Sequence, residues 1–252
     1  GEKLEIIYEK MSKSKFNGVD PSLVIDKYGV DTARLFILFK APPEKDLEWD
    51  DSDVEGQYRF IQRLWKLIIT NSTENNKLIN IDTKINHSEL SDNDKKVRTA
   101  VHTAIYEISN DLEGLQLNTA ISELMKLTNT LNEKISKCSP IVKYESLRNL
   151  TKLIAPFAPH LAEEFWERLG NTKSVHRENW PSVDNIALIK DTYDLVIQIN
   201  GKVRGRINVN NGSTKEELKL LAFNTDIVKK WLGDKSPKRI IIVPGRIINV
   251  VF

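Results

Sequence analysis

The spacing of apolar residues along the chain most constrains what it can fold into. Between positions 58 and 169, apolar side chains recur every three or four residues, which is the period of an amphipathic α-helix with one buried face. Beyond Pro181 they alternate with polar side chains instead, which is the period of a half-buried strand. The sequence therefore predicts a helical part followed by a part that contains a sheet.

Five apolar stripes divide the helical part. A polar, Asn-rich stretch at 71–93 separates the first stripe from the second and is predicted to be a loop. Pro156 and Pro159 separate the last two stripes, because proline does not continue a helix. The short connections favour an antiparallel helical bundle over residues 51–185. The stripes cover residues 58–68, 97–108, 121–135, 147–157 and 161–169.

Residues 1–50 carry start and stop signals for short helices of their own. Asp20 before Pro21 is typical of a helix N-terminus, and Asp31 is predicted to cap the next helix. The acidic stretch that follows, 46–55, lacks the ligand spacing and the glycine of a calcium loop. It is therefore predicted to be a solvated linker.

The last part, residues 186–252, is predicted to be a small α+β domain. Apolar residues alternate over 195–199, and Asn200-Gly201 is a strong signal for a two-residue hairpin turn. Ser213 and Glu216 are predicted to form a capping box at the start of the next helix. The order of elements is ββααββ. The whole chain is thus expected to be multidomain and mainly α.

Basic residues are concentrated at the end of the chain. Residues 190–252 contain twelve Lys and Arg and six Asp and Glu, a net charge of +6, whereas the complete chain has a net charge of +2. A basic end domain suggests a polyanionic partner. The alternative is a soluble domain with an ordinary charged surface.

Cysteine usage and hydropathy exclude several classes of protein. Cys138 is the sole cysteine, so an internal disulfide and a multi-thiolate metal site are excluded, and a cytoplasmic location is expected. No apolar run approaches the roughly 20 residues of a membrane-spanning helix, and no signal-peptide core is present at the start. Because the sequence begins without Met, it is expected to be a piece of a longer protein.

The loop Glu9–Gly18 is the segment most suggestive of chemistry. Lys10, Lys13 and Lys15 alternate with small hydroxyl residues. Their ammonium groups can reach a polyphosphate, while serine hydroxyls and backbone amides can donate to its oxygens. Phosphoryl and nucleotidyl transfer use such contacts, because negative charge is redistributed in the transition state. A solvated surface loop is the general alternative for such a composition.

Residues 10–14 read Lys-Met-Ser-Lys-Ser, which resembles the signature of class I aminoacyl-tRNA synthetases. Residues 15–34 resemble the continuation found in the leucine, isoleucine and valine enzymes, and 41–49 is similar to the leucine branch. Residues 153–164 resemble the helical, anticodon-binding-type bundle of this subfamily. Residues 199–206 and 243–251 resemble the C-terminal domain of the bacterial leucine branch. The resemblance spans essentially the whole chain.

The resemblance implies roles for the residues of the loop. Lys13 would contact the phosphates of ATP and stabilise the transition state of aminoacyl-adenylate formation, and Lys10 would assist. Met11, Ser12 and Ser14 would shape the ATP-binding loop, and Mg²⁺ is expected to accompany ATP. The loop holds no nucleophile or general base, so its contribution would be binding and electrostatics. No metal site in the chain itself is predicted.

Lys202, Arg204 and Arg206 form the second candidate site. A spacing of two along a strand places side chains on one face, with Val203 on the other face toward the helices. A basic strand face can follow a phosphate backbone, although it can also be the solvated side of a hairpin. The resemblance implies contact with the outer corner or the long variable arm of tRNA(Leu). The patch is expected to extend to Lys238, Arg239 and Arg246.

The other class I signature, His-Ile-Gly-His, is absent around His87, His102, His160 and His176. The resemblance therefore implies that residues 1–50 end a catalytic domain whose remainder lies outside this chain. The chain would supply an ATP loop and tRNA-binding domains to a monomeric enzyme that also binds leucine, and would be inactive alone. His160 is expected to be a packed or capping residue.

Two alternatives remain at this stage. The Lys-Met-Ser-Lys-Ser loop does not separate the leucine enzyme from the isoleucine or valine enzyme, and only the tail favours the leucine branch. A free-standing RNA-binding protein without catalytic activity is the alternative from a different class.

Overall fold

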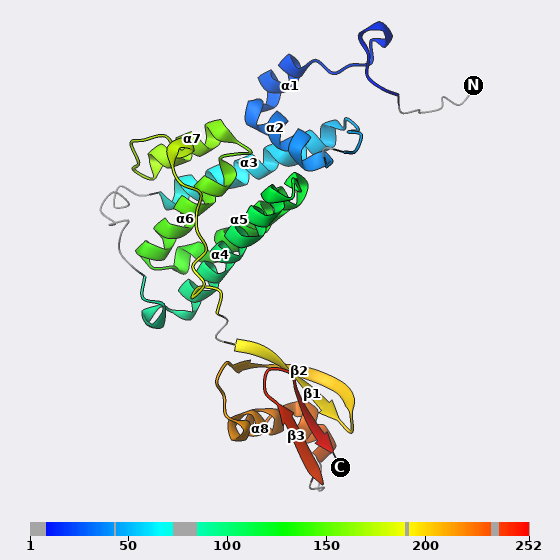
Figure 1. The fold of residues 1–252 in the computed structure, drawn as a ribbon, viewed down its shortest axis with the longest axis vertical. Helices are drawn as coiled ribbons and strands as arrows, with labels where there is room; N and C mark the ends of the chain where they lie inside the picture. Colours follow the sequence, from blue (N-terminus) through cyan, green and yellow to red (C-terminus); the bar gives the residue numbers. More distant parts are fainter. Residues whose placement is uncertain (1–8, 43, 73–84, 190–191, 233–236, 252) are drawn as a thin grey trace, which may run out of the picture. The chain divides into compact units, whose positions relative to one another are not determined.

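The computed structural model describes residues 9–42, 44–72, 85–189, 192–232 and 237–251. The chain divides into two compact units, residues 1–188 (unit 1) and 189–252 (unit 2), and each is described by itself (Figure 1). The described part is mostly helical, as the sequence predicts, and its strands form one small mixed sheet. None of its helices has the length and apolar character needed to cross a membrane.

The regular secondary structure in the described residues of unit 1 is entirely helical. Most of the predicted loop at 71–93 lies outside them. Short 3₁₀-helices occur at Lys13–Lys15, His87–Glu89, Ile135–Lys137 and Val175–Arg177. The α-helices are α1 (Pro21–Tyr28), α2 (Val30–Lys40), α3 (Asp51–Asn71), α4 (Asp92–Glu113), α5 (Leu117–Lys134), α6 (Pro140–Ile154) and α7 (Pro159–Arg168).

The core of unit 1 is built from the predicted apolar stripes. Helix α4 packs against α5 and α6, and α5 also packs against α2 and α3; Figure 1 shows α4 and α5 side by side. The buried side chains recur at helical spacing along each helix, which is why the periodicity predicts them. Trp65 departs from its stripe with 37% of its surface exposed, and Arg168 lies over its ring. The shared core includes Leu64, Val101, Ile105, Leu124, Leu131, Leu150 and Phe165.

The helix starts follow the local sequence at α1 but not at α2. The side chain of Asp20 accepts a hydrogen bond from the amide of Ser22, as predicted for the cap of α1. The prediction that Asp31 caps its own helix is wrong, because α2 begins after Gly29 and includes Asp31 in its first turn. The Asp31 carboxylate instead accepts from the amide of Leu161 in the first turn of α7, at 2.7 Å.

Unit 2 contains a four-stranded sheet and two helices. The elements in chain order are β1 (Thr192–Ile199), β2 (Lys202–Asn210), α8 (Lys215–Phe223), α9 (Asp226–Leu232), β3 (Arg239–Val243) and β4 (Ile247–Val251). The sheet order is β2-β1-β4-β3, with β1 parallel to β4 and the other neighbours antiparallel. Helices α8 and α9 contribute Leu218 and Val228 to the core on the sheet face that carries Leu195, Ile197 and Ile199.

Turn and cap residues define the boundaries in unit 2. Asn200 and Gly201 both have positive φ, 48° and 78°, which a type I′ hairpin turn requires, so the predicted turn is confirmed. The capping box lies one residue later than predicted. It joins Thr214 and Glu217, whose side chains each accept a hydrogen bond from the other's backbone amide.

Candidate functional site

The loop with the sequence Lys-Met-Ser-Lys-Ser is closed by one side chain, that of Asn17. Its Oδ1 accepts a hydrogen bond from the amide of Ser12 at 2.8 Å, and its Nδ2 donates to the carbonyl oxygen of Lys10 at 3.3 Å. Between Ser12 and Asn17 the chain makes the 3₁₀ turn Lys13–Lys15 and then takes the left-handed conformation at Phe16, whose φ is 52°. Asn17 therefore holds both sides of the loop, a role that sequence reasoning missed.

The three lysines of this loop are not equivalent. Lys15 forms an ion pair with Glu9. Lys10 and Lys13 are exposed, and neither forms an ion pair within the described part of the chain. Serine hydroxyls lie next to Lys13, with Ser12 Oγ and Ser14 Oγ 3.3 Å apart. The loop thus presents two uncompensated cations and two hydroxyl groups, a donor set that suits the oxygens of a polyphosphate.

Strand β2 contains a β-bulge at Arg204, and the bulge changes where the basic side chains lie. Gly205 is opposite Ile197 and Val203 is opposite Gln198, so Arg204 is an extra residue between paired positions. A bulge interrupts the alternation of side chains between the two faces of a sheet. Val203 consequently lies away from the helices with 59% of its surface exposed, and the prediction for its orientation is wrong.

The three basic side chains therefore do not share one face. Arg206 is opposite Val196, on the face away from the helices, whereas Lys202 is opposite Ile199, whose side chain is buried on the helix side. Arg204 is the bulged residue between them. All three side chains are exposed and line β2, which is an edge strand of the sheet.

Arg204 is held by an aromatic side chain that sequence reasoning did not connect with it. The guanidinium carbon of Arg204 lies 4.7 Å from the ring centre of Trp231 in α9, a cation–π contact. Trp231 is 44% exposed. Arg239 belongs to β3, at the opposite edge of the sheet from β2, so the predicted extension of the basic patch to this residue is wrong.

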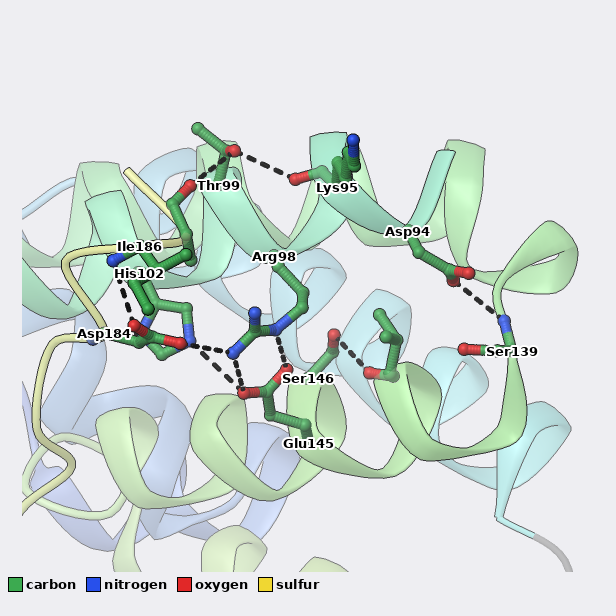
Figure 2. A network of polar contacts seen from close by, with 12 residues as sticks. Asp94, Lys95, Arg98, Thr99, His102, Ser139, Glu145, Ser146, Asp184 and Ile186 are labelled. Atoms are coloured by element: carbon green, nitrogen blue, oxygen red, sulfur yellow. Dashed lines mark hydrogen bonds and ion pairs between the residues drawn. The ribbon is translucent and has the colours of Figure 1, made fainter. Parts of the chain in front are cut away.

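A buried polar network joins α4, α6 and the segment that follows α7 (Figure 2). The guanidinium of Arg98, whose side chain is only 3% exposed, donates to Glu145 at 2.7 and 2.9 Å and to Asp184 at 2.8 Å. His102 accepts from the amide of Asp184 at its Nδ1, which leaves Nε2 to donate to Glu145. Thr99 donates to the carbonyl of Ala187. Residues 184–187 are thereby tied to α4.

Two carboxyl groups in this network have lowered pKa values. Burial by itself raises the pKa of Glu145, but hydrogen bonds from His102 and Arg98 outweigh it and bring the pKa below its ordinary value. The pKa of Asp184 is lowered in the same way: burial raises it, but the hydrogen bond from Arg98 outweighs that effect. Both carboxylates are therefore ionised partners of a buried cation. The network is far in sequence from the loop lysines and shares no residue with either predicted site.

A pocket of about 450 Å³ adjoins this network and is lined by Tyr144, Arg148, Lys152 and Trp180 among others. Burial, together with the charge of Arg148, lowers the pKa of Lys152, although Glu178 opposes this. Arg148 and Lys152 both lie over the ring of Trp166 and both pair with Glu178. These contacts engage both cations, and the pocket lies where α6 packs against the segment that follows α7.

Comparison with known families gives two matches. Residues 94–220 match the anticodon-binding domain of tRNA ligase, about half of the chain. Residues 8–50 match the class I tRNA synthetases of the I, L, M and V group. The second match contains the loop described above, and the first begins in α4.

Curated relatives match over the full length of this chain. A leucine–tRNA ligase of Prochlorococcus marinus (strain MIT 9211) is 58% identical over 253 residues, and one of Synechococcus sp. (strain CC9605) is 55% identical over 253 residues. Each match covers 100% of this chain but 29% of the relative. The chain therefore spans less than a third of the length of these relatives.

A solved structure is similar as well. It is the ternary complex of the Agrobacterium radiobacter K84 agnB2 LeuRS with tRNA and LeuAMS, with a TM-score of 0.77 and 32% sequence identity. The match covers 96% of this chain and 30% of that one.

Proposed function

Since this chain belongs to the family of the anticodon-binding domain of tRNA ligase, we propose that it is the C-terminal part of a leucine–tRNA ligase. Such an enzyme activates leucine with ATP to leucyl-adenylate and transfers the leucyl group to tRNA(Leu). The observation that carries the proposal is the loop at 10–14, whose Lys10 and Lys13 are exposed and lack ion-pair partners among the described residues. The relatives, leucine–tRNA ligases at 55–58% identity, support leucine over isoleucine or valine.

In this proposal Lys13 is the principal catalytic group of the chain. Its ammonium group contacts the phosphates of ATP, with Mg²⁺, and stabilises the charge that develops on them as the adenylate forms. Lys10, which precedes Met11 and Ser12 in the same loop, assists Lys13 in binding the phosphates. Ser12 and Ser14 supply hydroxyl donors, and the hydrogen bonds of Asn17 to the backbone of Ser12 and Lys10 close the loop. No residue in the loop needs to react covalently, because positioning and electrostatics suffice.

The remaining parts of the chain are assigned to tRNA. We assign residues 1–50 to the end of the catalytic domain, 51–185 to an antiparallel, anticodon-binding-type bundle, and 186–252 to a ββααββ domain that binds tRNA. The basic edge of β2, formed by Lys202, Arg204 and Arg206, is the proposed contact with tRNA phosphates. The complete ligase is proposed to act as a monomer in the cytoplasm.

The proposal is tested with lysine variants in the complete ligase that contains this chain. Lys13→Ala removes a charged contact that is made mainly in the transition state, so leucine-dependent ATP–pyrophosphate exchange is expected to slow by about a hundredfold or more. The apparent affinity for leucine is expected to change little.

Lys15→Ala is the matched control, because Lys15 lies in the same loop but is already paired with Glu9. Its exchange rate is expected to stay within about threefold of the wild-type rate. Equal exchange rates for folded Lys13→Ala and Lys15→Ala proteins would contradict the assignment of Lys13. Failure of the wild-type ligase to charge tRNA(Leu) with leucine would contradict the proposed function itself.

A further inference from the structure

Two side chains of α2 form hydrogen bonds with the turn between α6 and α7, residues 156–161 (the α6–α7 corner). Arg34 donates from Nη2 to the carbonyl oxygen of Pro156 at 3.0 Å and from Nε to that of Phe157 at 3.4 Å. Asp31 accepts from the amide of Leu161 at 2.7 Å and from Nδ1 of His160 at 2.9 Å. His160, expected from the sequence to be a packed or capping residue, therefore takes part in a cap supplied by another helix.

The Asp31 contact with Leu161 satisfies an amide in the first turn of α7, and the Arg34 contacts satisfy carbonyl oxygens of the turn between α6 and α7. The first amides of α7 have no partner within that helix, and the carbonyls that Arg34 contacts lie beyond Ile154, the last residue of α6. The guanidinium of Arg34 contacts the turn that follows the C-terminal end of α6, where the helix dipole is negative, and the carboxylate of Asp31 contacts the positive N-terminal end of α7. The side chain of Asp31 is only 11% exposed, so water competes little for its hydrogen bonds. Asp31 and Arg34 lie about one helical turn apart on α2, so their hydrogen bonds restrict both sliding and rotation of α2 relative to the α6–α7 corner.

Helix α2 is also connected to the ATP loop. The loop ends at Gly18, and α1 begins at Pro21. A small apolar cluster of Val24, Phe36 and Val54 packs α1 and α2 against the start of α3. The contacts of α2 with the α6–α7 corner, together with its packing against α3 and α5, therefore set where the chain continues toward the loop.

The two sides of this contact, α2 and the α6–α7 corner, belong to segments that match different families. Asp31 and Arg34 lie within residues 8–50, which match the class I tRNA synthetases. The corner at 156–161 lies within residues 94–220, which match the anticodon-binding domain. This contact therefore connects the piece with the ATP loop to the piece assigned to tRNA.

We infer that Asp31 and Arg34 are positioning residues that hold the ATP-loop segment in a fixed orientation on the helical bundle, so that tRNA bound through the bundle presents its acceptor end correctly to the adenylate. This inference rests on the proposed function. Activation of leucine does not use tRNA, whereas transfer depends on the relative placement of the two segments. Misplacement by about 1 Å is enough to slow a reaction on the order of a hundredfold.

The test uses the complete ligase with Asp31→Ala, Arg34→Ala and the double variant. For each single variant, kcat for leucylation of tRNA(Leu) is expected to fall roughly tenfold or more. The KM for tRNA and the rate of ATP–pyrophosphate exchange are expected to stay within about twofold. The double variant is expected to be little worse than either single one, because the two side chains grip the same corner. Arg34→Lys, which keeps a cationic donor, is expected to recover part of the loss.

Asp26→Ala is the matched control, because Asp26 is an exposed carboxylate on α1; all its kinetic parameters should equal those of the wild type. Thermal melting of every variant separates positioning from folding. A parallel loss of exchange and leucylation that follows the melting temperature would show a purely structural role and overturn the inference. Unchanged leucylation would overturn it as well. In both cases the wild-type enzyme still charges tRNA(Leu), so the proposed function would stand.

Discussion

Removal of the Glu145 carboxylate should destabilise unit 1 more than removal of any surface charge. Glu145 accepts two hydrogen bonds from Arg98 and one from His102. In Glu145→Ala, the guanidinium of Arg98 would remain buried with Asp184 as its single acidic partner. Removing one partner of a buried ion pair costs about 3–5 kcal/mol, because the remaining charge is no longer compensated. The expected loss of unfolding free energy lies in this range.

Asp184→Ala is the matched comparison within the same network. The Asp184 side chain is 34% exposed and accepts one hydrogen bond from Arg98, so water can replace part of what it supplies. Its loss is expected to cost about 1 kcal/mol. The double variant Arg98→Ala with Glu145→Ala should cost clearly less than the sum of the two single variants, by about 2–3 kcal/mol. This non-additivity distinguishes loss of the Arg98–Glu145 ion pair from loss of side-chain packing, because packing losses alone would add.

The assay is urea unfolding of the purified chain, followed by helical circular dichroism, which reports mainly on unit 1. The pKa of Glu145 is lowered in the folded protein, so its stabilisation is present above the unfolded pKa of about 4.3 and is lost as the pH falls toward the folded pKa. The difference between wild type and Glu145→Ala should therefore be constant near neutral pH and shrink below about pH 4. A difference under about 1 kcal/mol at neutral pH, or one that grows on acidification, would refute the reasoning.

Two further predictions concern unit 2. Gly205→Ala should destabilise this unit by about 1 kcal/mol, because the new Cβ would clash with Cδ1 of Ile227, the end of a part-buried side chain that can shift. Ile227→Val, which removes that atom, should restore most of the loss in urea unfolding, and additive costs would contradict the proposed clash. Replacement of Lys202, Arg204 and Arg206 together by Ala in the complete ligase should weaken tRNA(Leu) binding and flatten the dependence of log affinity on log salt by up to about 0.7–0.9 for each phosphate that these side chains neutralise, and an unchanged salt slope in a folded variant would show that this edge is only a solvated surface.

Features that depend on neighbouring residues in the chain could be predicted from the sequence. The helical stripe at 97–108 is buried where its period places it, and the Asn200-Gly201 turn has the positive φ values that its residues favour. The order of the elements follows from the same local signals. The loop at 10–14 was also recognisable, because its residues are contiguous and their chemistry does not depend on partners elsewhere. Capping was predictable to within one residue at α8 and correctly at α1.

The tertiary structure decided the features in which distant residues compete for one polar group. The local sequence around Asp31 is typical of a helix cap, yet its carboxylate accepts a hydrogen bond from the amide of Leu161, 130 residues away. Arg98 finds Glu145 and Asp184 across 47 and 86 residues, spacings that no periodicity marks. The bulge at Arg204 arises where β2 is paired with β1, and it overrides the alternation of side chains on which the single basic face depended. Local sequence sets the dihedral preferences of each segment, but which buried donor meets which acceptor is determined only when the helices and strands pack together.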